Sequence, residues 1–288
     1  FWEYEKAKHM NIIGIGNAGC AIADKFAKYP QYQVYKIDTG LKGNKKDGIF
    51  CMPDQPGPEE YESACPSFKS FFKNISGSVY LFVAGSGDIS ACSLRVMEAL
   101  KNCQLNVVYI RPDITLLSGN KKMMENVTFN VFQEYARSGA FERLYIISNP
   151  DIEAIIGDIP IMSYYDVIND FIVNTFHMVN VYEHSNPVHS HVFASDDISR
   201  ICTLGVYDIE KTEEKMFFAL DKIKYKYYIY AINKDTLESD GTLFRKITNQ
   251  TKDMIKEQRI NINFEIFSTN YDHNYGYIIA NSHIIQGY

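Results

Sequence analysis

The chain has 288 residues, 46% hydrophobic and 22% charged, a composition typical of a folded globular protein rather than a disordered one. Its formal net charge is −6 and it has no long basic run, which excludes a dedicated nucleic-acid binder whose affinity rests on neutralising phosphates. No apolar run approaches the roughly 20 residues of a membrane span, and the length predicts two packed units.

Residues 1–9 end in a histidine before Met10, which is typical of a cloning remnant, so we leave them out of the fold prediction. No signal peptide is visible. The six cysteines form no C-x-x-C pair. We therefore expect free buried thiols in a reducing compartment and a cytoplasmic location.

From Asn11 to about Asn149, apolar strands alternate with amphipathic helical segments. This rhythm predicts an α/β fold with a parallel sheet and helices on both faces. The segment Thr39–Ser67 has Gly, Pro and Lys without periodicity and is predicted to be a loop. The expected strands are Asn11–Ile15, Gln33–Asp38, Val79–Ala84, Asn106–Arg111 and Arg143–Ser148, and the expected helices are Ala18–Lys28, Ser90–Asn102 and Met123–Ser138.

Residues Ser163–His184 have apolar side chains at three-to-four spacing, which predicts one long helix. A polar turn with three histidines follows it. From Ile201 onward the pattern predicts a second unit that ends in an antiparallel hairpin. Its expected elements are a helix near Lys211–Ile223, a strand at Tyr227–Ile232, a helix at Gly241–Glu257 and the hairpin strands Asn261–Ser268 and Gly276–Asn281.

Two glycine-rich turns lie about 70 residues apart, each where a predicted strand gives way to a helix. Glycine lets the backbone approach a phosphate closely, and helix N-termini attract anions. Two such turns predict a nucleotide pocket lined by backbone N–H groups. The first turn holds Gly14, Gly16 and Gly19 in the spacing G-x-G-x-x-G, and the second holds Gly85, Ser86, Gly87 and Asp88.

An NAD site of the Rossmann type is one interpretation of the first turn. Asp38 ends the next strand about 20 residues on, where a ribose hydroxyl would be held. However, NAD binding does not require the second glycine turn, and no His, Tyr-Lys or Cys arrangement suits a hydride acceptor. An NAD-dependent oxidoreductase is therefore the less favoured alternative.

The order of the motifs resembles the tubulin/FtsZ superfamily of GTP-dependent cytoskeletal proteins, from Asn11 to about Ser282. Residues 12–22 resemble the first nucleotide loop of that family, and residues 35–40 its I-N-T-D stretch. Residues 85–90 take the place of the phosphate loop G-G-G-T-G-T-G. Residues 109–112 and 118–124 are similar to the ribose-side loop and the helix after it.

The likeness continues toward the C-terminus. Residues 144–151 resemble the strand that ends in I-P-N-D, whose Asn touches guanine, and this implies Asn149 as a guanine contact. Residues 165–172 resemble the long central helix, which puts Asn169 near the second guanine contact. An Asn amide can both donate and accept hydrogen bonds. A helix cap or turn residue is the alternative role for Asn149.

The resemblance implies a parallel, Rossmann-like GTPase domain over 10–162, a central helix and loop over 163–191, and a smaller α+β domain over 192–288. It also implies GTP or GDP as the ligand, with Mg²⁺ as a further candidate. The residues that it places around the nucleotide are Gly14, Gly16, Asn17, Ala18, Gly19, Cys20, Asp38, Gly85, Ser86, Gly87, Asp88, Ile89, Ser90, Arg111, Pro112, Asn149 and Asn169.

The phosphate loop departs from the family pattern, because its threonines are absent and Asp88 adds a carboxylate beside the expected phosphates. A carboxylate there repels the nucleotide unless a cation such as Mg²⁺ bridges the two. The alternative is that Asp88 caps the helix that starts near Ser90.

The acidic loop that positions water in this family, N-x-D-x-x-D, is also incomplete. Within residues 191–200, Asp196 or Asp197 matches the second acid, but Phe193 or Ala194 stands where the first belongs. We therefore expect weak or absent GTP hydrolysis, since loss of such a group costs about 10²–10⁴ in rate.

The nearby histidines His189 and His191 are either a replacement for the missing acid or turn residues in solvent, and His184 lies close to them in the sequence. A metal site there is disfavoured, because no carboxylate or Cys lies at ligand spacing.

For partners, the resemblance implies head-to-tail self-association into filaments, or association with a host FtsZ/tubulin-like filament. A nucleotide-independent binding or regulatory module is the alternative, motivated by Asp88 and the missing acid. The chain ends soon after its last predicted strand, so we expect no docking tail. The strong divergence favours a phage or mobile-element relative.

Overall fold

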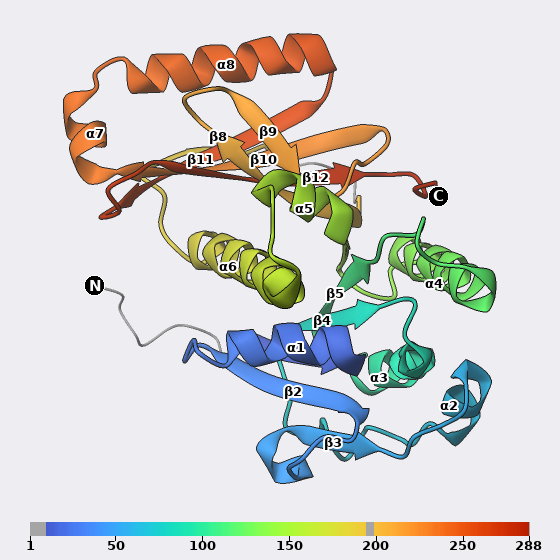
Figure 1. The fold of residues 1–288 in the computed structure, drawn as a ribbon. Helices are drawn as coiled ribbons and strands as arrows, with labels where there is room; N and C mark the ends of the chain where they lie inside the picture. The colour runs from blue at the N-terminus through green and yellow to red at the C-terminus, as the bar shows by residue number, and fades with distance from the viewer. Residues whose placement is uncertain (1–9, 194–198, 288) are drawn as a thin grey trace. The chain divides into compact units, whose positions relative to one another are not determined.

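A computed structural model describes residues 10–193 and 199–287 (Figure 1). The chain divides into two compact units, one up to Val173 and one from Asn174 to Gly287. This division falls inside the long helix α6 (Tyr164–Glu183), which the sequence predicted as a single helix. In the part of the chain that the structure describes, no helix has the length and apolar character needed to cross a bilayer.

The first unit is built on an all-parallel sheet in the order β3-β2-β1-β4-β5-β6. All six residues of β1 are buried, as are five consecutive residues of β4, so helices cover both faces of the sheet. The α/β prediction is thereby confirmed. The strands are β1 (Met10–Ile15), β2 (Tyr32–Thr39), β3 (Ile49–Met52), β4 (Ser78–Ala84), β5 (Gln104–Arg111) and β6 (Arg143–Ser148).

The helices of this unit follow the strands, as expected for right-handed crossovers (Figure 1). The predicted helix 90–102 is shorter and begins with a 3₁₀ segment, and the predicted helix 123–138 begins four residues earlier, at Gly119. The helical segments are α1 (Gly16–Phe26), η1 (Lys45–Asp47), α2 (Pro58–Ala64), η2 (Asp88–Cys92), α3 (Ser93–Ala99), α4 (Gly119–Arg137), α5 (Asn149–Ile156), η3 (Ile161–Ser163) and the first half of α6.

Two segments of the first unit differ from the prediction. The segment Thr39–Ser67 is not a continuous loop, because β3 adds an edge strand and α2 follows it. Both elements are too short to show a periodic pattern. Helix α5 was missed although its start has two sequence signals, a serine cap at Ser148 and a proline at Pro150 in the first turn.

The start of α6 is held to α1 by ion pairs. Lys25 Nζ lies 2.6 Å from Asp166 Oδ1 and 3.0 Å from Asp170 Oδ1. The two aspartates are four residues apart and so share one side of α6. These ion pairs join the start of α6 to the C-terminal end of α1, the helix that begins in the first glycine turn.

The second unit has a mixed sheet in the order β8-β12-β10-β11-β7, with β9 paired to the outer side of β8. Strands β10 and β11 are parallel, and the other pairs are antiparallel. Its elements are the second half of α6, β7 (His189–His191), β8 (Ile201–Asp208), β9 (Glu213–Met216), β10 (Ile223–Asn233), α7 (Lys234–Ser239), α8 (Leu243–Gln258), β11 (Asn261–Thr269) and β12 (Tyr275–Ser282).

The predicted helix near Lys211–Ile223 is wrong. This segment forms β9, whose residues alternate between exposed and half-buried beside β8. Glu, Lys and Met favour a helix locally, but pairing with a neighbouring strand overrides that preference.

The predicted hairpin of the last two strands is also wrong, because β10 lies between β11 and β12. The connection after β11 reaches across the end of β10, where the Asn233 side chain donates to the Tyr271 carbonyl at 2.6 Å.

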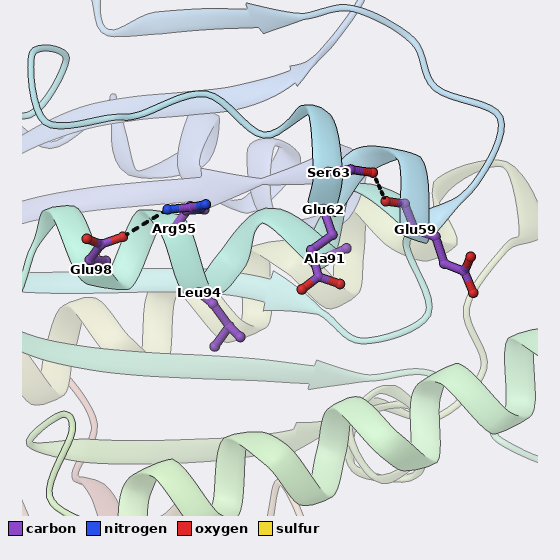
Figure 2. Close-up of a pocket in the computed structure, with 7 residues that line it drawn as sticks. All are labelled: Glu59, Glu62, Ser63, Ala91, Leu94, Arg95 and Glu98. Carbon is purple, nitrogen blue, oxygen red and sulfur yellow. Dashed lines mark hydrogen bonds and ion pairs between the residues drawn. The ribbon is translucent and has the colours of Figure 1, made fainter.

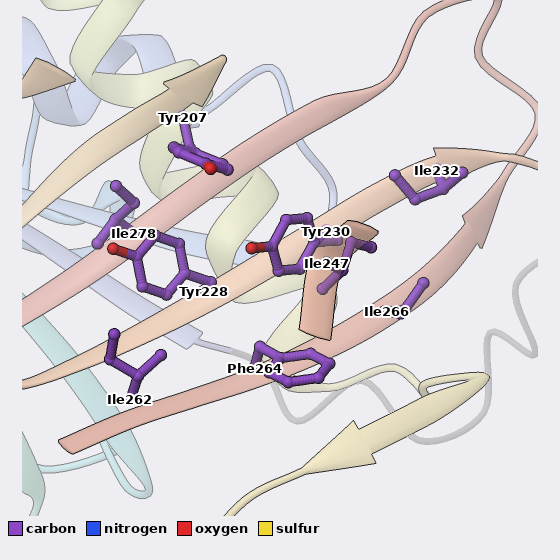
Figure 3. Packing of buried hydrophobic residues seen from close by; sticks show 9 residues of the cluster. All are labelled: Tyr207, Tyr228, Tyr230, Ile232, Ile247, Ile262, Phe264, Ile266 and Ile278. Carbon is purple, nitrogen blue, oxygen red and sulfur yellow. The ribbon is translucent and has the colours of Figure 1, made fainter. Parts of the chain in front are cut away.

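A tyrosine-rich core fills the space between this sheet and α8 (Figure 3). Within it, Lys226 is only 4% exposed. Its Nζ lies 2.5 Å from Glu214 Oε2 and donates to Gln258 Oε1 at 2.8 Å, so the buried charge is paired and hydrogen-bonded. The core residues are Tyr207, Tyr228, Tyr230, Ile232, Ile247, Ile262, Phe264, Ile266 and Ile278.

Candidate nucleotide site

The carboxyl ends of the parallel strands of the first unit meet along one edge of its sheet. In the register of that sheet, Ile15 is paired with Ile37, Ala84 with Ile110, and Arg111 with Ser148. The turns after β1, β4, β5 and β6 therefore leave the sheet on the same side. In open α/β sheets this edge is where ligands bind.

The first glycine turn brings α1 into direct contact with the sheet. A Cβ at Gly14 would lie 2.3 Å from the Gly19 carbonyl oxygen, and one at Gly19 would lie 2.4 Å from the Phe82 carbonyl oxygen. Helix α1 begins at Gly16, whose φ is +70°, with no side-chain cap and no acidic residue in its first turn. The N–H groups of that turn thus suit an anion.

The structure brings the two glycine turns together. A Cβ at Gly16 in the first turn would lie 2.9 Å from Ile89 Cγ2 in the second. The second turn is closed by Ser90, whose Oγ donates to the Gly87 carbonyl at 2.5 Å. The 3₁₀ helix η2 that follows has no side-chain cap at Gly87. Two N–H-bearing turns thus lie side by side.

Asp88 has a lysine partner that the sequence did not reveal. Lys121 Nζ, in the first turn of α4, donates to Asp88 Oδ1 at 2.7 Å and to the Ser86 carbonyl at 3.3 Å. The carboxylate is therefore balanced by a cation of the chain itself. The predicted helix began only at Met123, so the sequence analysis did not place Lys121 within it.

Cys20 and Asp38 lie behind the first turn. The Cys20 thiol donates to the Gly14 carbonyl at 3.4 Å and lies 3.7 Å from the Ile37 carbonyl. Burial and the nearby charge of Asp38 raise the pKa of Cys20 to about 12, so this thiol packs the turn and does not act as a nucleophile. Asn17 is exposed and Ala18 is half-buried on the first turn of α1.

Arg111 ends β5 and is buried beside an unpredicted carboxylate. Its Nε lies 3.7 Å from Glu125 Oε1 of α4, and its guanidinium carbon lies 4.1 Å from the centre of the Phe129 ring. Glu125 is fully buried. The only sequence signal for Glu125 is an acid on the side of the helix that also carries Phe129 and Phe132. Pro112, next in the chain, is half-buried.

Asn149 is the first residue of α5 but does not cap it, because Ser148 accepts the hydrogen bond from the Asp151 amide. The side-chain Oδ1 of Asn149 is buried and has no hydrogen-bond partner among the described residues. Such an orphaned acceptor at the edge of the sheet fits a ligand that donates. Asn169 is 9% exposed and lies three residues after Asp166, near the side of α6 that faces α1.

The two predicted catalytic acids, Asp196 and Asp197, lie outside the described residues. The nearby histidines pack against aromatic rings: His189 lies 4.7 Å from Phe244, and His191 lies 5.1 Å from Phe264, measured between ring centres. Within residues 10–193 and 199–287 no group of three His, Cys, Asp or Glu side chains could hold a metal ion.

A pocket of about 560 Å³ lies beside this region, between α2 and the η2–α3 segment (Figure 2). Three glutamates and one arginine line it, and Arg95 already contacts Glu98 at 3.5 Å. This acidic lining disfavours a phosphate. The residues around it are Glu59, Glu62, Ser63, Ala91, Leu94, Arg95 and Glu98.

Burial raises the pKa of Glu125 to about 7, against smaller lowering effects from the Tyr109 hydroxyl and the Arg111 charge. The folded chain therefore keeps this proton between about pH 4.5 and 7 while the unfolded chain loses it. Stability conferred by this group is present at low pH and is lost as the pH rises through that window.

We compare the free energies of unfolding of Glu125→Gln and wild type. The value for the variant minus that for wild type should increase by about 2 kcal/mol between about pH 5 and 8, because wild type loses stability there. Urea titrations at several pH values measure this difference. The matched control is Glu134→Gln, an exposed residue of the same helix, and its difference should stay constant. A flat difference for Glu125→Gln would contradict the expected titration.

The first unit thus has a parallel sheet with two adjoining glycine turns at its carboxyl edge, and a mixed-sheet unit follows the long helix. Comparison with solved structures shows this to be the fold of the tubulin/FtsZ superfamily, which the order of the sequence motifs predicted. No protein-family model matches the chain, and no curated protein sequence does.

Three of the similar structures illustrate the match. A helical model of a four-stranded TubZ-Bt filament has a TM-score of 0.71 at 14% identity, covering 96% of this chain and 86% of that one. The GDP-bound CetZ1 monomer of Haloferax volcanii has a TM-score of 0.68 at 14% identity, and the match covers 96% of this chain and 94% of that one. An empty FtsZ dimer of M. jannaschii has a TM-score of 0.67 at 13% identity, and the match covers 97% of this chain and 89% of that one.

Proposed function

We propose that this chain binds a guanine nucleotide at the carboxyl edge of its parallel sheet and assembles head to tail into filaments, with weak or no GTP hydrolysis. The observation that carries the proposal is the close approach of the two glycine turns, Gly16 lying against Ile89, which supports a site to which both turns contribute backbone N–H groups. Triphosphate oxygens would be held there by residues 16–20 and 85–90.

Recognition of the base would fall to asparagine. The buried Oδ1 of Asn149, which has no partner within residues 10–193 and 199–287, would accept a hydrogen bond from guanine N1 or N2, and Asn169 would supply the second contact. Asp38 and Pro112 would border the ribose. A divalent cation such as Mg²⁺ would accompany the phosphates and balance their charge.

The similar structures support the assembly step. Bacillus thuringiensis serovar israelensis TubZ is described in GDP-form protofilaments and in a GTPγS-form protofilament. A head-to-tail contact that does not close generates a filament. If nucleotide lies between successive protomers, binding strengthens that contact. Asp196 or Asp197 would act from the neighbouring protomer, and the missing first acid would keep hydrolysis slow.

The alternative is a module that keeps the fold without the nucleotide, and the observation that favoured it was Asp88. Its pairing with Lys121 weakens that argument, because the carboxylate does not face the site uncompensated. NAD, the remaining alternative, would leave the second glycine turn without a role.

Calorimetry on nucleotide-stripped protein tests the proposal, with GTP, GDP, ATP and NAD as ligands. We expect binding selective for GTP and GDP, and growth of light scattering with GTP and with a non-hydrolysable analogue. Binding of none of the four would leave the nucleotide-independent module, and selective binding of NAD would establish the oxidoreductase alternative. Each measurement should be repeated with EDTA to test the Mg²⁺ requirement.

Asp88→Asn should bind GTP about tenfold more tightly than wild type, equivalent to about 1.4 kcal/mol. The substitution removes a negative charge from the phosphate loop and releases Lys121, which then attracts phosphate. Titration calorimetry at low salt measures the change.

The matched control for this variant is Asp24→Asn. Asp24 lies on α1 outside both turns, and its Oδ1 is 2.6 Å from Lys36 Nζ, so the substitution breaks a similar ion pair. Its affinity should be that of wild type. Weaker binding by Asp88→Asn would mean that the carboxylate helps to hold the nucleotide, through a bridging cation.

A further inference from the structure

A buried acid–base pair lies directly behind the second glycine turn. Gly85 rests on the Tyr109 hydroxyl and the Glu125 carboxylate, since a Cβ at Gly85 would lie 1.6 Å from Tyr109 Oη and 2.5 Å from Glu125 Oε2. Both supporting side chains are completely buried. The position of the turn is thus set by these two side chains.

Among the described residues, Tyr109 and Arg111 of β5 are the titratable or charged groups that act on Glu125. From the turn itself, the backbone of Gly85 faces it. The next charged pair is Asp88 with Lys121 at the outer side of the turn, and it is self-neutralising. Arg111 Nε stands 3.7 Å from Glu125 Oε1, which is beyond hydrogen-bond distance.

A carboxylate in this setting is sensitive to any anion that arrives on the other side of Gly85. A fully buried carboxylate loses the solvation that stabilises its charge, and its main counterion is a single guanidinium. A bound phosphate would add negative potential through one peptide unit, favouring the protonated acid. Protonation would remove the negative charge of Glu125 from behind the turn, so the phosphate would no longer be repelled by it.

We propose that Glu125 is a positioning residue of the phosphate turn that couples nucleotide binding to proton uptake, so that phosphate binds more tightly when Glu125 is protonated. This inference rests on the proposed function, because it concerns the same site. Linkage is reciprocal: if binding favours the proton, the proton favours binding by the same factor. In the folded chain without nucleotide the pKa of Glu125 is about 7, so proton uptake on binding would occur close to neutral pH.

The test is calorimetry of GDP binding to the full chain between about pH 6 and 8.5, in two buffers with different ionisation enthalpies. We expect affinity to fall about tenfold across this range, which is the size of a coupling of one pKa unit. The buffer pair gives the number of protons taken up. The terminal phosphate of GDP itself titrates near pH 6 and contributes equally to every variant. The effect of Glu125 is therefore measured as the difference in pH dependence between variants.

Glu125→Gln should lose the pH dependence that wild type shows beyond the ligand's own titration, whereas the exposed control Glu134→Gln should keep it. Tyr109→Phe is the second variant, needed if Glu125→Gln does not fold. It removes a hydroxyl that lowers the pKa of Glu125, so the midpoint of the profile should move to higher pH.

The outcomes separate the two proposals. Binding without extra proton uptake, or a profile unmoved in Glu125→Gln and Tyr109→Phe, overturns the role of Glu125 and leaves the nucleotide site intact. The absence of any nucleotide binding by wild type at every pH overturns the proposed function, and the coupling with it. Proton uptake that disappears with Glu125 supports both.

Discussion

Gly14→Ala is expected to lose about 3 kcal/mol of stability, or to fail to fold. The added Cβ would lie 2.3 Å from the Gly19 carbonyl oxygen and 2.7 Å from the Cys20 amide nitrogen. Both are backbone atoms of α1, which cannot rotate away as a side chain can. The helix would have to move off β1, and Gly19 in turn rests on the carbonyl of Phe82 in β4. Urea unfolding measures the loss.

Gly241→Ala is the matched control for this prediction. No atom lies within 4 Å of a Cβ at Gly241, and its backbone is not left-handed. Its stability should stay within about 0.5 kcal/mol of wild type. Wild-type stability in Gly14→Ala would show that α1 does not approach β1 as closely as described. Loss in both variants would mean that the chain tolerates no glycine substitution, and the argument from close contact would then fail.

The parallel half of the fold could be predicted from sequence because its strands are buried on both faces. A run such as Ile12–Ile15 is apolar throughout and is followed at once by glycines, so strand, turn and helix are marked within a few residues. The second unit was harder. Strand β9 has the composition of a helix and becomes a strand only by pairing with β8, a contact that no local pattern reveals.

The hairpin error has a different cause. Two consecutive alternating strands with a polar turn between them are typical of a hairpin, and the sequence holds no sign that β10 separates them. Strand order depends on which edges are already occupied. In this unit β10 pairs with β11 on one side, up to Asn233. It pairs with β12 on the other side, up to Ala231.

At the candidate site, glycine residues could be found from sequence but their supports could not. The motif spacing identified Gly14, Gly19 and Gly85, since close approach by backbone requires that residue type. The side chains that contact the second turn, Glu125 against Gly85 and Lys121 paired with Asp88, come from a helix more than 30 residues further along. Their roles depend on tertiary contacts, and the sequence shows them only as charged residues of a helix.

Gly85→Ala is expected to weaken GTP binding about 100-fold while the chain stays folded, equivalent to roughly 2.7 kcal/mol. The new Cβ would lie 1.6 Å from Tyr109 Oη, so the turn must move outward by about an ångström or more. Displacements of that size at a positioned site cost about two orders of magnitude. Calorimetry with GTP, with circular dichroism to confirm folding, measures the effect.

Gly87→Ala, two residues further along the same turn, is the matched control. Its φ is −83°, which any residue adopts, and a Cβ there would meet only the Ala84 carbonyl oxygen at 3.8 Å. Its affinity should stay within about threefold of wild type. Equal losses in the two variants would show that the turn itself, and not its buried support, resists substitution.

Tyr109→Phe in the Gly85→Ala background refines this prediction. Removing the hydroxyl relieves the contact at 1.6 Å, but the ring carbon Cζ would remain 2.5 Å from the new Cβ. The rescue should therefore be partial, restoring some of the affinity but not all of it. Complete rescue would mean that the ring can withdraw into the core, and no rescue would place the main obstruction at Glu125. The double variant thus identifies which side chain holds the second glycine turn in place.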